Sequence, residues 1–173
     1  MEGIKMGGIK IKIRAAIFDL DGTLANIDHR LHYIKGEKKD WDGFYREVPL
    51  DSVNKWCHDL MDMLSSTGIR PVLITARKGS SKIKQQTSDW FWKYTSIGTI
   101  RREHTYWVRE ADDYRPDTEL KEKCLVEKIL PNYDILFAVD DRESIAQVYR
   151  RHGIPTLVCS SWENDANRHD TQA

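Results

Sequence analysis

The sequence lacks an excess of charge of either sign. Its 173 residues include 27 Lys and Arg side chains and 27 Asp and Glu side chains, so the formal net charge at pH 7 is zero. A protein without net charge has no general attraction to nucleic acid or to a membrane surface. Any binding of an anion must therefore come from a local group of basic residues.

Cysteines and long apolar segments are also scarce. The three cysteines, Cys57, Cys124 and Cys159, are far apart and form no Cys-x-x-Cys pair. This argues against a disulfide framework and a structural zinc site, and we expect reduced thiols that pack as small apolar side chains. Because the N-terminal region has no long apolar run, we expect no signal peptide, no membrane span and a cytoplasmic location.

One short stretch joins an apolar run to two acids. The run Ala15–Phe18 predicts a strand that is buried on both faces. Asp19 and Asp21 follow it two positions apart, so on a strand they would point the same way, and Gly22 allows a sharp change of direction. Two acids at the end of a buried strand are costly unless a cation or hydrogen bonds compensate them.

This arrangement of acids suits phosphoryl transfer. One carboxylate would attack phosphorus, the second would transfer protons, and a hard cation such as Mg²⁺ would offset the charge. The alternative is a strand-to-turn junction whose acids face solvent, because acids and glycine are common where strands end. The motif alone leaves both interpretations open.

Predicted strands and helices alternate along the chain. The strands are predicted over residues 15–18, 70–74, 104–108, 133–139 and 155–159. The helices are predicted from Asp51 or Ser52 to Gly68, from Ser80 or Ser81 to Tyr94, over 117–129, and over 143–152. The alternation predicts an α/β fold with a Rossmann-like parallel sheet and helices on both faces. Ligands bind at the carboxyl ends of such strands, which is where the sequence places Asp19, Asp21, Thr75, Asp140 and Asp141.

Three parts are predicted along the chain: an N-terminal arm over 1–12, one domain over 13–162 and a flexible polar tail over 163–173. Alternating isoleucines at 9, 11 and 13 predict either an early start of the central strand or a short hairpin arm. Residues 26–50 form an irregular flap that is too short for its own core, so we expect a minimal cap or none. Its aromatic residues are expected to hold it against the domain: Tyr33, Trp41, Phe44 and Tyr45.

The acid motif, Asp19-x-Asp21-Gly-Thr, resembles the nucleophile motif of the haloacid dehalogenase superfamily of phosphatases. Three further signatures of that superfamily follow in the expected order: Thr75 at a strand end, Lys121 in a helical pattern, and the pair Asp140-Asp141 after an apolar strand. The resemblance implies a haloacid dehalogenase-like phosphatase domain over 13–162.

The same resemblance implies a role for each matched residue. Asp19 would be the nucleophile, Asp21 the general acid and base, and Thr75 a hydrogen-bond donor to the phosphoryl group. Lys121 would offset negative charge. The implied cofactor is Mg²⁺, held by Asp19, the backbone carbonyl of Asp21, Asp140 and Asp141. Adjacent strand acids point in opposite directions, so one of the last two is expected to be the direct ligand, with Asp140 preferred.

A narrower resemblance covers the stretch Asp113-Tyr114-Arg115-Pro116-Asp117-x-x-x-Lys121 and the stretch Val139-Asp140-Asp141-Arg142. Both are similar to the phosphatase domain of bacteriophage polynucleotide kinase-phosphatases. Arg30 and Arg77 match substrate-contacting arginines of that family, and Arg115 is expected to pair with Asp117. The resemblance implies a substrate-binding set of Arg30, Thr75, Arg77, Arg115, Asp117 and Lys121.

The sequence thus predicts a Mg²⁺-dependent phosphatase that removes 3′-phosphate from DNA or RNA ends through an aspartyl-phosphate. No Gly-x-x-x-x-Gly-Lys-Ser/Thr loop occurs, so we expect no kinase half and action alongside a separate kinase or ligase. The alternatives are a phosphatase for small molecules such as nucleotides and a non-catalytic subunit that binds ends. The pair of Asp19 and Asp21 argues against the latter, because a pure binder needs no acid–base residue. DNA or RNA preference and oligomeric state stay open.

Overall fold

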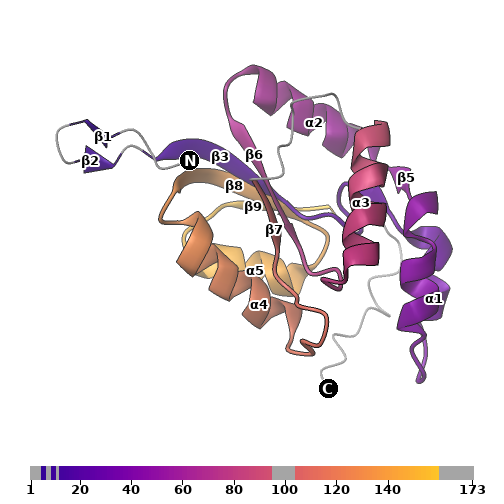
Figure 1. Cartoon of the computed structure of the whole chain (residues 1–173). Helices are drawn as coiled ribbons and strands as arrows, with labels where there is room; N and C mark the ends of the chain where they lie inside the picture. Colours follow the sequence, from indigo (N-terminus) through magenta and orange to yellow (C-terminus); the bar gives the residue numbers. More distant parts are fainter. Residues whose placement is uncertain (1–4, 7–8, 11, 95–103, 160–173) are drawn as a thin grey trace.

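The computed structural model describes residues 5–6, 9–10, 12–94 and 104–159 (Figure 1). A five-stranded sheet in the order β7-β6-β3-β8-β9 lies at its centre, and every neighbouring pair in it is parallel. Its strands, in chain order, are β3 (Ile13–Phe18), β6 (Arg70–Thr75), β7 (Thr105–Trp107), β8 (Tyr133–Asp140) and β9 (Thr156–Val158). The predicted α/β fold class is confirmed.

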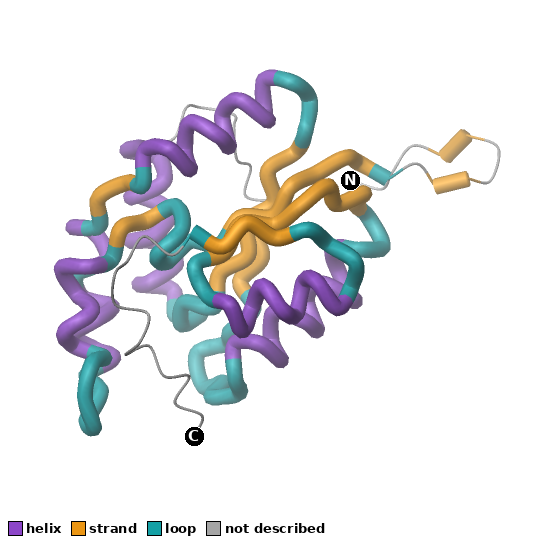
Figure 2. The backbone as a smooth tube through the Cα atoms, turned by 180° about the vertical axis from the view of Figure 1, so that it is seen from behind, coloured by secondary structure: helices purple, strands orange, loops and turns teal. Residues whose placement is uncertain are grey.

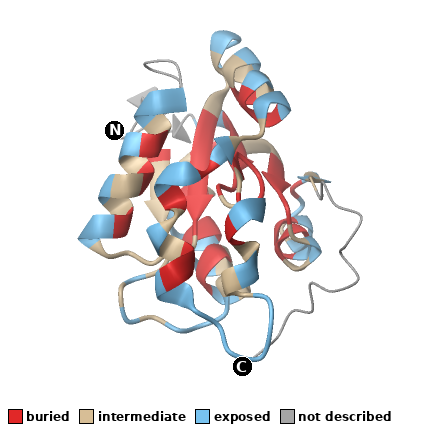
Figure 3. Cartoon of the chain, turned by 90° about the vertical axis from the view of Figure 1, so that its right-hand side faces the viewer, coloured by how far each residue is buried: buried red, intermediate tan, exposed pale blue. Residues whose placement is uncertain are grey.

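Helices cover both faces of the sheet (Figures 1 and 2). On one face lie α2 (Lys55–Ser66) and α3 (Ser81–Tyr94), and on the other lie α4 (Asp117–Cys124), a π-helical turn η4 (Leu125–Ile129) and α5 (Glu143–Arg151). Side chains of β3 alternate between the two cores: Ile17 packs with α4 and α5, and Phe18 packs with α2 and α3. Because both faces of the sheet are covered, the buried part of β3, Ala15–Phe18, consists of apolar residues alone, and the buried centre follows the strands in Figure 3.

A small hairpin precedes the sheet. Strand β1 (Lys5–Met6) pairs antiparallel with β2 (Ile9–Lys10), and β3 begins at Ile13. Of the two alternatives for this region, the hairpin arm is therefore the one that forms. The predicted flexible tail, 163–173, lies outside the described residues, and the division into arm, domain and tail stays a prediction.

The flap is less irregular than the sequence predicts. It begins within β4 (Ala25–Asn26) and contains the 3₁₀ helix η1 (Asp28–Tyr33), α1 (Trp41–Arg46) and the 3₁₀ turn η2 (Val48–Leu50). These elements are too short to repeat an apolar period, so the pattern of the sequence did not reveal them. The side chain of Asp40 caps α1 by accepting a hydrogen bond from the backbone nitrogen of Gly43 at 2.8 Å.

The aromatic residues of the flap divide into two groups. Phe44 is buried in the core, and Tyr33 and Tyr45 are partly buried and pack against it, as predicted. Trp41 remains 45% exposed, so the expectation that it holds the flap against the domain is wrong. It starts α1 at the outer surface, where one face of a short helix must meet solvent.

The helix predicted to begin at Asp51 or Ser52 begins at Lys55. Ser52 and Val53 instead form β5, which pairs antiparallel with β4. Asp51 is not a helix cap because its buried carboxylate is bound by two arginines from other parts of the chain. In the part of the chain that the structure describes, no helix combines the length and the apolar character that crossing a membrane requires.

Candidate active site

The carboxyl ends of three adjacent strands bring the predicted site residues together. In the sheet, Phe18 of β3 is in register with Leu73 of β6 and with Val139 of β8. The next polar residues along these strands are Asp19, Thr75 and the pair Asp140-Asp141. They therefore meet at one edge of the sheet, which is where parallel α/β sheets bind ligands.

Three carboxylates form a candidate metal centre at this edge. One oxygen each of Asp19, Asp140 and Asp141 lie within 4.8 Å of one another, and all three residues are buried. Burial raises the pKa of Asp19, and the nearby charges of Asp140 and Asp141 raise it further, against the lowering effect of Lys121. Oxygen donors of this charge and spacing fit a hard divalent cation such as Mg²⁺, which would relieve the repulsion.

Gly22 makes room for this cluster. Its φ of +81° lies in the left-handed region, and a Cβ at this position would collide with the carboxylate of Asp141. A residue with a side chain would therefore strain the turn and displace an acid of the cluster. The sharp departure that the sequence predicted at Gly22 is thus also a close approach between two motifs.

Lys121 supplies a positive charge beside Asp19, the candidate nucleophile. Its ammonium group is fully buried and lies 2.6 Å from Oδ1 of Asp19 and 2.7 Å from Oδ2 of Asp140. Burial alone would lower the pKa of Lys121, but the carboxylates of Asp140 and Asp19 raise it, so the side chain stays charged. A buried lysine held by two acids is positioned to offset charge on a phosphoryl group.

Two arginines bind the candidate general acid. Arg77 donates from Nε to Oδ2 of Asp21 at 2.9 Å and from a terminal nitrogen to Oδ1 at 2.6 Å, and Arg30 donates to the same Oδ1 at 2.6 Å. Burial alone would raise the pKa of Asp21, but Arg77 and Arg30 hold it well below its usual range. The side chain of Asp21 is still 24% exposed, so a substrate can reach it.

Asp51 completes this network and was missed by the sequence analysis. Its two carboxylate oxygens accept hydrogen bonds from Nε of Arg30 at 2.6 Å and from a terminal nitrogen of Arg77 at 2.8 Å. The indole nitrogen of Trp90 donates to the backbone oxygen of Asp51 at 2.6 Å, which fixes the turn that carries it. Two acids and two arginines thus form a buried cluster with no net charge.

Thr75 occupies the position predicted for a phosphoryl contact. The residue is buried at the end of β6, and its hydroxyl oxygen accepts a hydrogen bond from the backbone nitrogen of Arg77 at 3.2 Å. A hydroxyl that accepts one hydrogen bond still has its own proton to donate. The side chain is therefore suited to bind an oxygen of a phosphoryl group.

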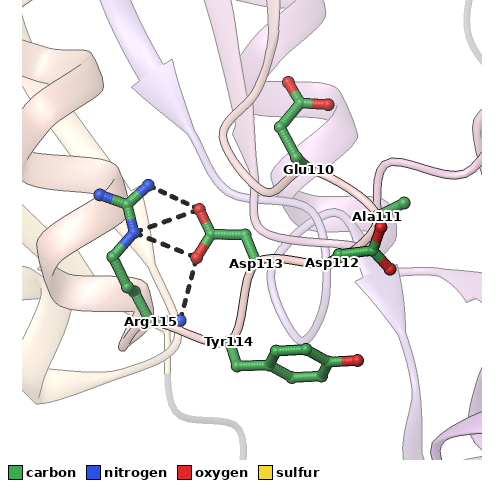
Figure 4. A pocket seen from close by; sticks show the side chains of 6 residues that line it. All are labelled: Glu110, Ala111, Asp112, Asp113, Tyr114 and Arg115. Atoms are coloured by element: carbon green, nitrogen blue, oxygen red, sulfur yellow. Dashed lines mark hydrogen bonds and ion pairs between the residues drawn. The ribbon is translucent and has the colours of Figure 1, made fainter.

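The expected pair of Arg115 and Asp117 does not form. Arg115 pairs with Asp113 at 2.6 Å and with Glu119 at 3.2 Å, and its side chain is 46% exposed on the rim (Figure 4). Asp117 pairs instead with Arg109 and, at 2.7 Å, with Arg142. Asp113 lies only two positions from Arg115, so the local partner is the one that Arg115 binds.

Arg109 is a second residue that the sequence did not reveal. It donates to the backbone oxygen of Ala76 at 3.1 Å, to that of Arg115 at 2.9 Å, and to the carboxylate of Asp117. It thereby joins the turn after β6 to the loop before α4. Close packing of these two segments requires Gly79, since a Cβ there would collide with the backbone oxygen of Arg109.

The loop held by Arg109 borders a shallow, open depression. Its lining residues are Glu110, Ala111, Asp112, Asp113, Tyr114 and Arg115 (Figure 4). Asp19, Asp140 and Asp141 do not line this depression. We therefore assign the chemistry to the buried edge of the sheet and regard the depression as part of the rim of the site.

A family model of the polynucleotide kinase PNKP phosphatase domain matches residues 13–161. The chain belongs to this family. The predicted resemblance to haloacid dehalogenase phosphatases and, more narrowly, to the phosphatase domain of polynucleotide kinase-phosphatases is therefore confirmed.

Individual relatives of this PNKP-type phosphatase domain agree with the family assignment. A protein of Autographa californica nuclear polyhedrosis virus, named as a bifunctional polynucleotide kinase/RNA ligase, is 29% identical over an alignment of 157 residues. The match covers 86% of this chain and 20% of that protein. The chain thus spans about a fifth of this curated relative.

Solved structures of low identity share the fold. Chains in two structures of the Pnkp1/Rnl/Hen1 complex, the second described as an RNA repair complex, match with TM-scores of 0.64 and 0.67 at 24% and 22% identity. The matches cover 85% and 91% of this chain but only 46% and 45% of the others. A class C acid phosphatase of Bacillus anthracis, with tungstate bound, matches with a TM-score of 0.59 at 17% identity, over 86% of this chain and 66% of that one.

Proposed function

We propose that this protein is a Mg²⁺-dependent phosphatase that removes 3′-phosphate from polynucleotide ends through an aspartyl-phosphate intermediate. The observation that carries the proposal is the buried contact of Lys121 with Asp19, next to the arginine-bound Asp21. A nucleophile, a charge-neutralising lysine and an acid–base residue then lie at one edge of the sheet. Membership of the PNKP phosphatase-domain family supports the choice of a polynucleotide end as substrate.

The first half-reaction transfers the phosphoryl group to the protein. A carboxylate oxygen of Asp19 attacks phosphorus, a new phosphorus–oxygen bond forms, and the bond from phosphorus to the 3′-oxygen breaks. Asp21 gives its proton to that leaving oxygen. Asp19, Asp140, Asp141 and the backbone carbonyl of Asp21 would hold Mg²⁺. When bound, the ion would act as a Lewis acid that stabilises charge on the phosphoryl oxygens.

The second half-reaction restores Asp19. The carboxylate of Asp21 takes a proton from water, the water oxygen attacks phosphorus, and the bond to Asp19 breaks, releasing inorganic phosphate. Lys121 remains beside Asp19 throughout and offsets the charge that the phosphoryl group adds. Thr75 donates its hydroxyl proton to a phosphoryl oxygen.

The arginines explain how an acid with a low pKa becomes a proton donor. In the substrate-free site Arg30 and Arg77 both bind Asp21, which keeps it ionised. An incoming phosphate dianion competes for the same guanidinium groups. Once they turn toward phosphate, Asp21 loses part of their stabilisation and its pKa rises toward the range where it carries a proton.

The relatives suggest a role in nucleic-acid end repair. The name of the viral relative combines polynucleotide kinase with RNA ligase, and one of the similar structures is described as an RNA repair complex. Removal of a 3′-phosphate leaves the hydroxyl end that a ligase joins. A separate kinase or ligase is therefore the partner class of the proposal. The proposed setting is the reducing cytoplasm, in keeping with the three free thiols of Cys57, Cys124 and Cys159.

The test is phosphate release from a matched panel: 3′-phosphate and 5′-phosphate oligonucleotides as DNA and as RNA, and 3′- and 5′-mononucleotides. The proposal expects fastest release from a 3′-phosphate oligonucleotide, loss of activity with EDTA and recovery with Mg²⁺. Faster release from 5′-mononucleotides would favour a small-molecule phosphatase instead. Undiminished activity after metal removal would contradict the mechanism.

A further inference from the structure

An aromatic stack leads from the active site to the surface of the flap. The rings of Trp41 and Tyr45 are stacked, with centroids 6.1 Å apart and planes at 26°, and Trp41 meets Phe44 edge-on at 5.7 Å. Tyr45 is partly buried, whereas Trp41 is 45% exposed. Trp41 is therefore the most exposed ring of the stack, and the ammonium group of Lys39 also lies over its ring.

The inner rings of this stack touch the machinery that binds the general acid. The guanidinium carbon of Arg30 lies 4.1 Å from the centre of the Phe44 ring. The hydroxyl of Tyr45 accepts a hydrogen bond from the backbone nitrogen of Lys78 at 3.2 Å, directly after Arg77 in the chain. Burial and, after it, the charge of Asp21 raise the pKa of Tyr45 to about 12, so this hydroxyl lies within electrostatic range of the acid.

On the basis of the proposed function, we propose that Trp41 is the stacking platform for a base at the phosphorylated end of the substrate strand. A strand whose terminal phosphate reaches Asp19 must leave the site along its rim, where the flap carries this ring. Stacking on an exposed aromatic face tolerates any base, which suits an enzyme that acts on ends of varied sequence. The ammonium group of Lys39 lies 6.0 Å from the centre of the Trp41 ring, within reach of a neighbouring internucleotide phosphate.

A chemical deletion of the bases tests this role. The experiment compares two 3′-phosphate oligonucleotides. In one, the two nucleotides at the 3′ end carry bases, and in the other these two nucleotides are abasic. For the substrate with bases, Trp41→Ala should lower kcat/KM by roughly 5- to 150-fold, the range expected for one stacked base. For the abasic substrate, Trp41→Ala should change kcat/KM little. For the substrate with bases, Trp41→Phe should keep most of the activity that Trp41→Ala loses.

Trp92→Ala is the matched control. Trp92 is also an exposed tryptophan, at 54%, but it sits near the far end of α3, roughly 17 Å along the helix from its start at Ser81. Trp92→Ala should leave kcat/KM for both substrates unchanged. Suppose that the wild type releases 3′-phosphate. An equal fall in kcat/KM of Trp41→Ala on both substrates, or no fall on either, would then overturn the inference and leave the proposed function standing. Failure of the wild type to act on either oligonucleotide would overturn the proposed function and this inference together.

Discussion

Arg77 donates hydrogen bonds to both carboxylate oxygens of Asp21, across 56 positions of sequence. The same guanidinium group also binds Asp51 at 2.8 Å. One arginine therefore connects the strand that carries the acid motif, the end of the flap and the turn after β6. In the proposed mechanism, substrate phosphate competes with Asp21 for this group, which would link substrate binding to the protonation of the acid.

Replacing Arg77 with lysine should abolish most of the activity although it keeps the charge. Lysine cannot reproduce the planar pair of hydrogen bonds that Arg77 makes with Asp21 and that a phosphate would take over. We expect kcat/KM for a 3′-phosphate oligonucleotide to fall by at least about tenfold, the loss of a single charge-assisted hydrogen bond. Arg150→Lys is the control, since Arg150 pairs with Glu143 at an exposed position and should tolerate the change.

Asp51→Asn should destabilise the fold as well as the site. It leaves the buried charges of Arg30 and Arg77 without one of their two acids. Removing one partner of a buried ion pair costs about 3–5 kcal/mol, so the free energy of unfolding in urea should fall by about that amount. Asp59→Asn breaks an exposed pair with Lys55 and should cost no more than about 1 kcal/mol. Equal losses in the two variants would contradict the account of the buried cluster.

Stability should fall when the pH drops below 6.5 because of His58. Burial lowers the pKa of His58 from its ordinary 6.5, and the side chain packs edge-on against Trp90 at 5.8 Å. Between the lowered pKa and 6.5, the unfolded chain binds a proton that the folded protein does not, so unfolding becomes easier as pH falls. The slope from this residue is at most about 1.4 kcal/mol per pH unit.

The measurement is the free energy of unfolding between pH 7 and pH 5 for the wild type and for His58→Gln. The variant has no titrating ring, so its stability should depend less on pH in this window. His32→Gln removes an exposed histidine and should leave the slope unchanged. A wild-type slope that persists in His58→Gln would assign the effect to another group.

The parts of the site that the sequence predicted are those fixed by local structure. Asp19, Thr75 and the pair Asp140-Asp141 each end a strand with a readable apolar pattern, and parallel strands must bring their carboxyl ends together. Lys121 was identified from a family resemblance, and the structure places it beside Asp19. The fold class followed from the alternation of strands and helices for the same reason.

The parts that sequence reasoning missed depend on contacts between distant segments. Asp51 has the pattern of a helix cap, and its two arginines are found only once the chain has folded. Arg109 follows a short edge strand, with nothing in the local pattern to suggest that it binds Asp117 and Ala76. Trp41 belongs to a helix of six residues, too short for a periodic pattern to show which face is exposed.

Transfer of the phosphate to the protein tests the central claim most directly. The wild type with Mg²⁺ is mixed with an oligonucleotide whose 3′-phosphate is radiolabelled, the reaction is stopped with acid in the first turnover, and label bound to protein is measured. We predict a labelled protein whose label lies on Asp19, no label in Asp19→Asn, and little or none from a 5′-labelled oligonucleotide. Phosphate release without labelled protein, label in Asp19→Asn, or equal label from the 5′-phosphate would contradict the account.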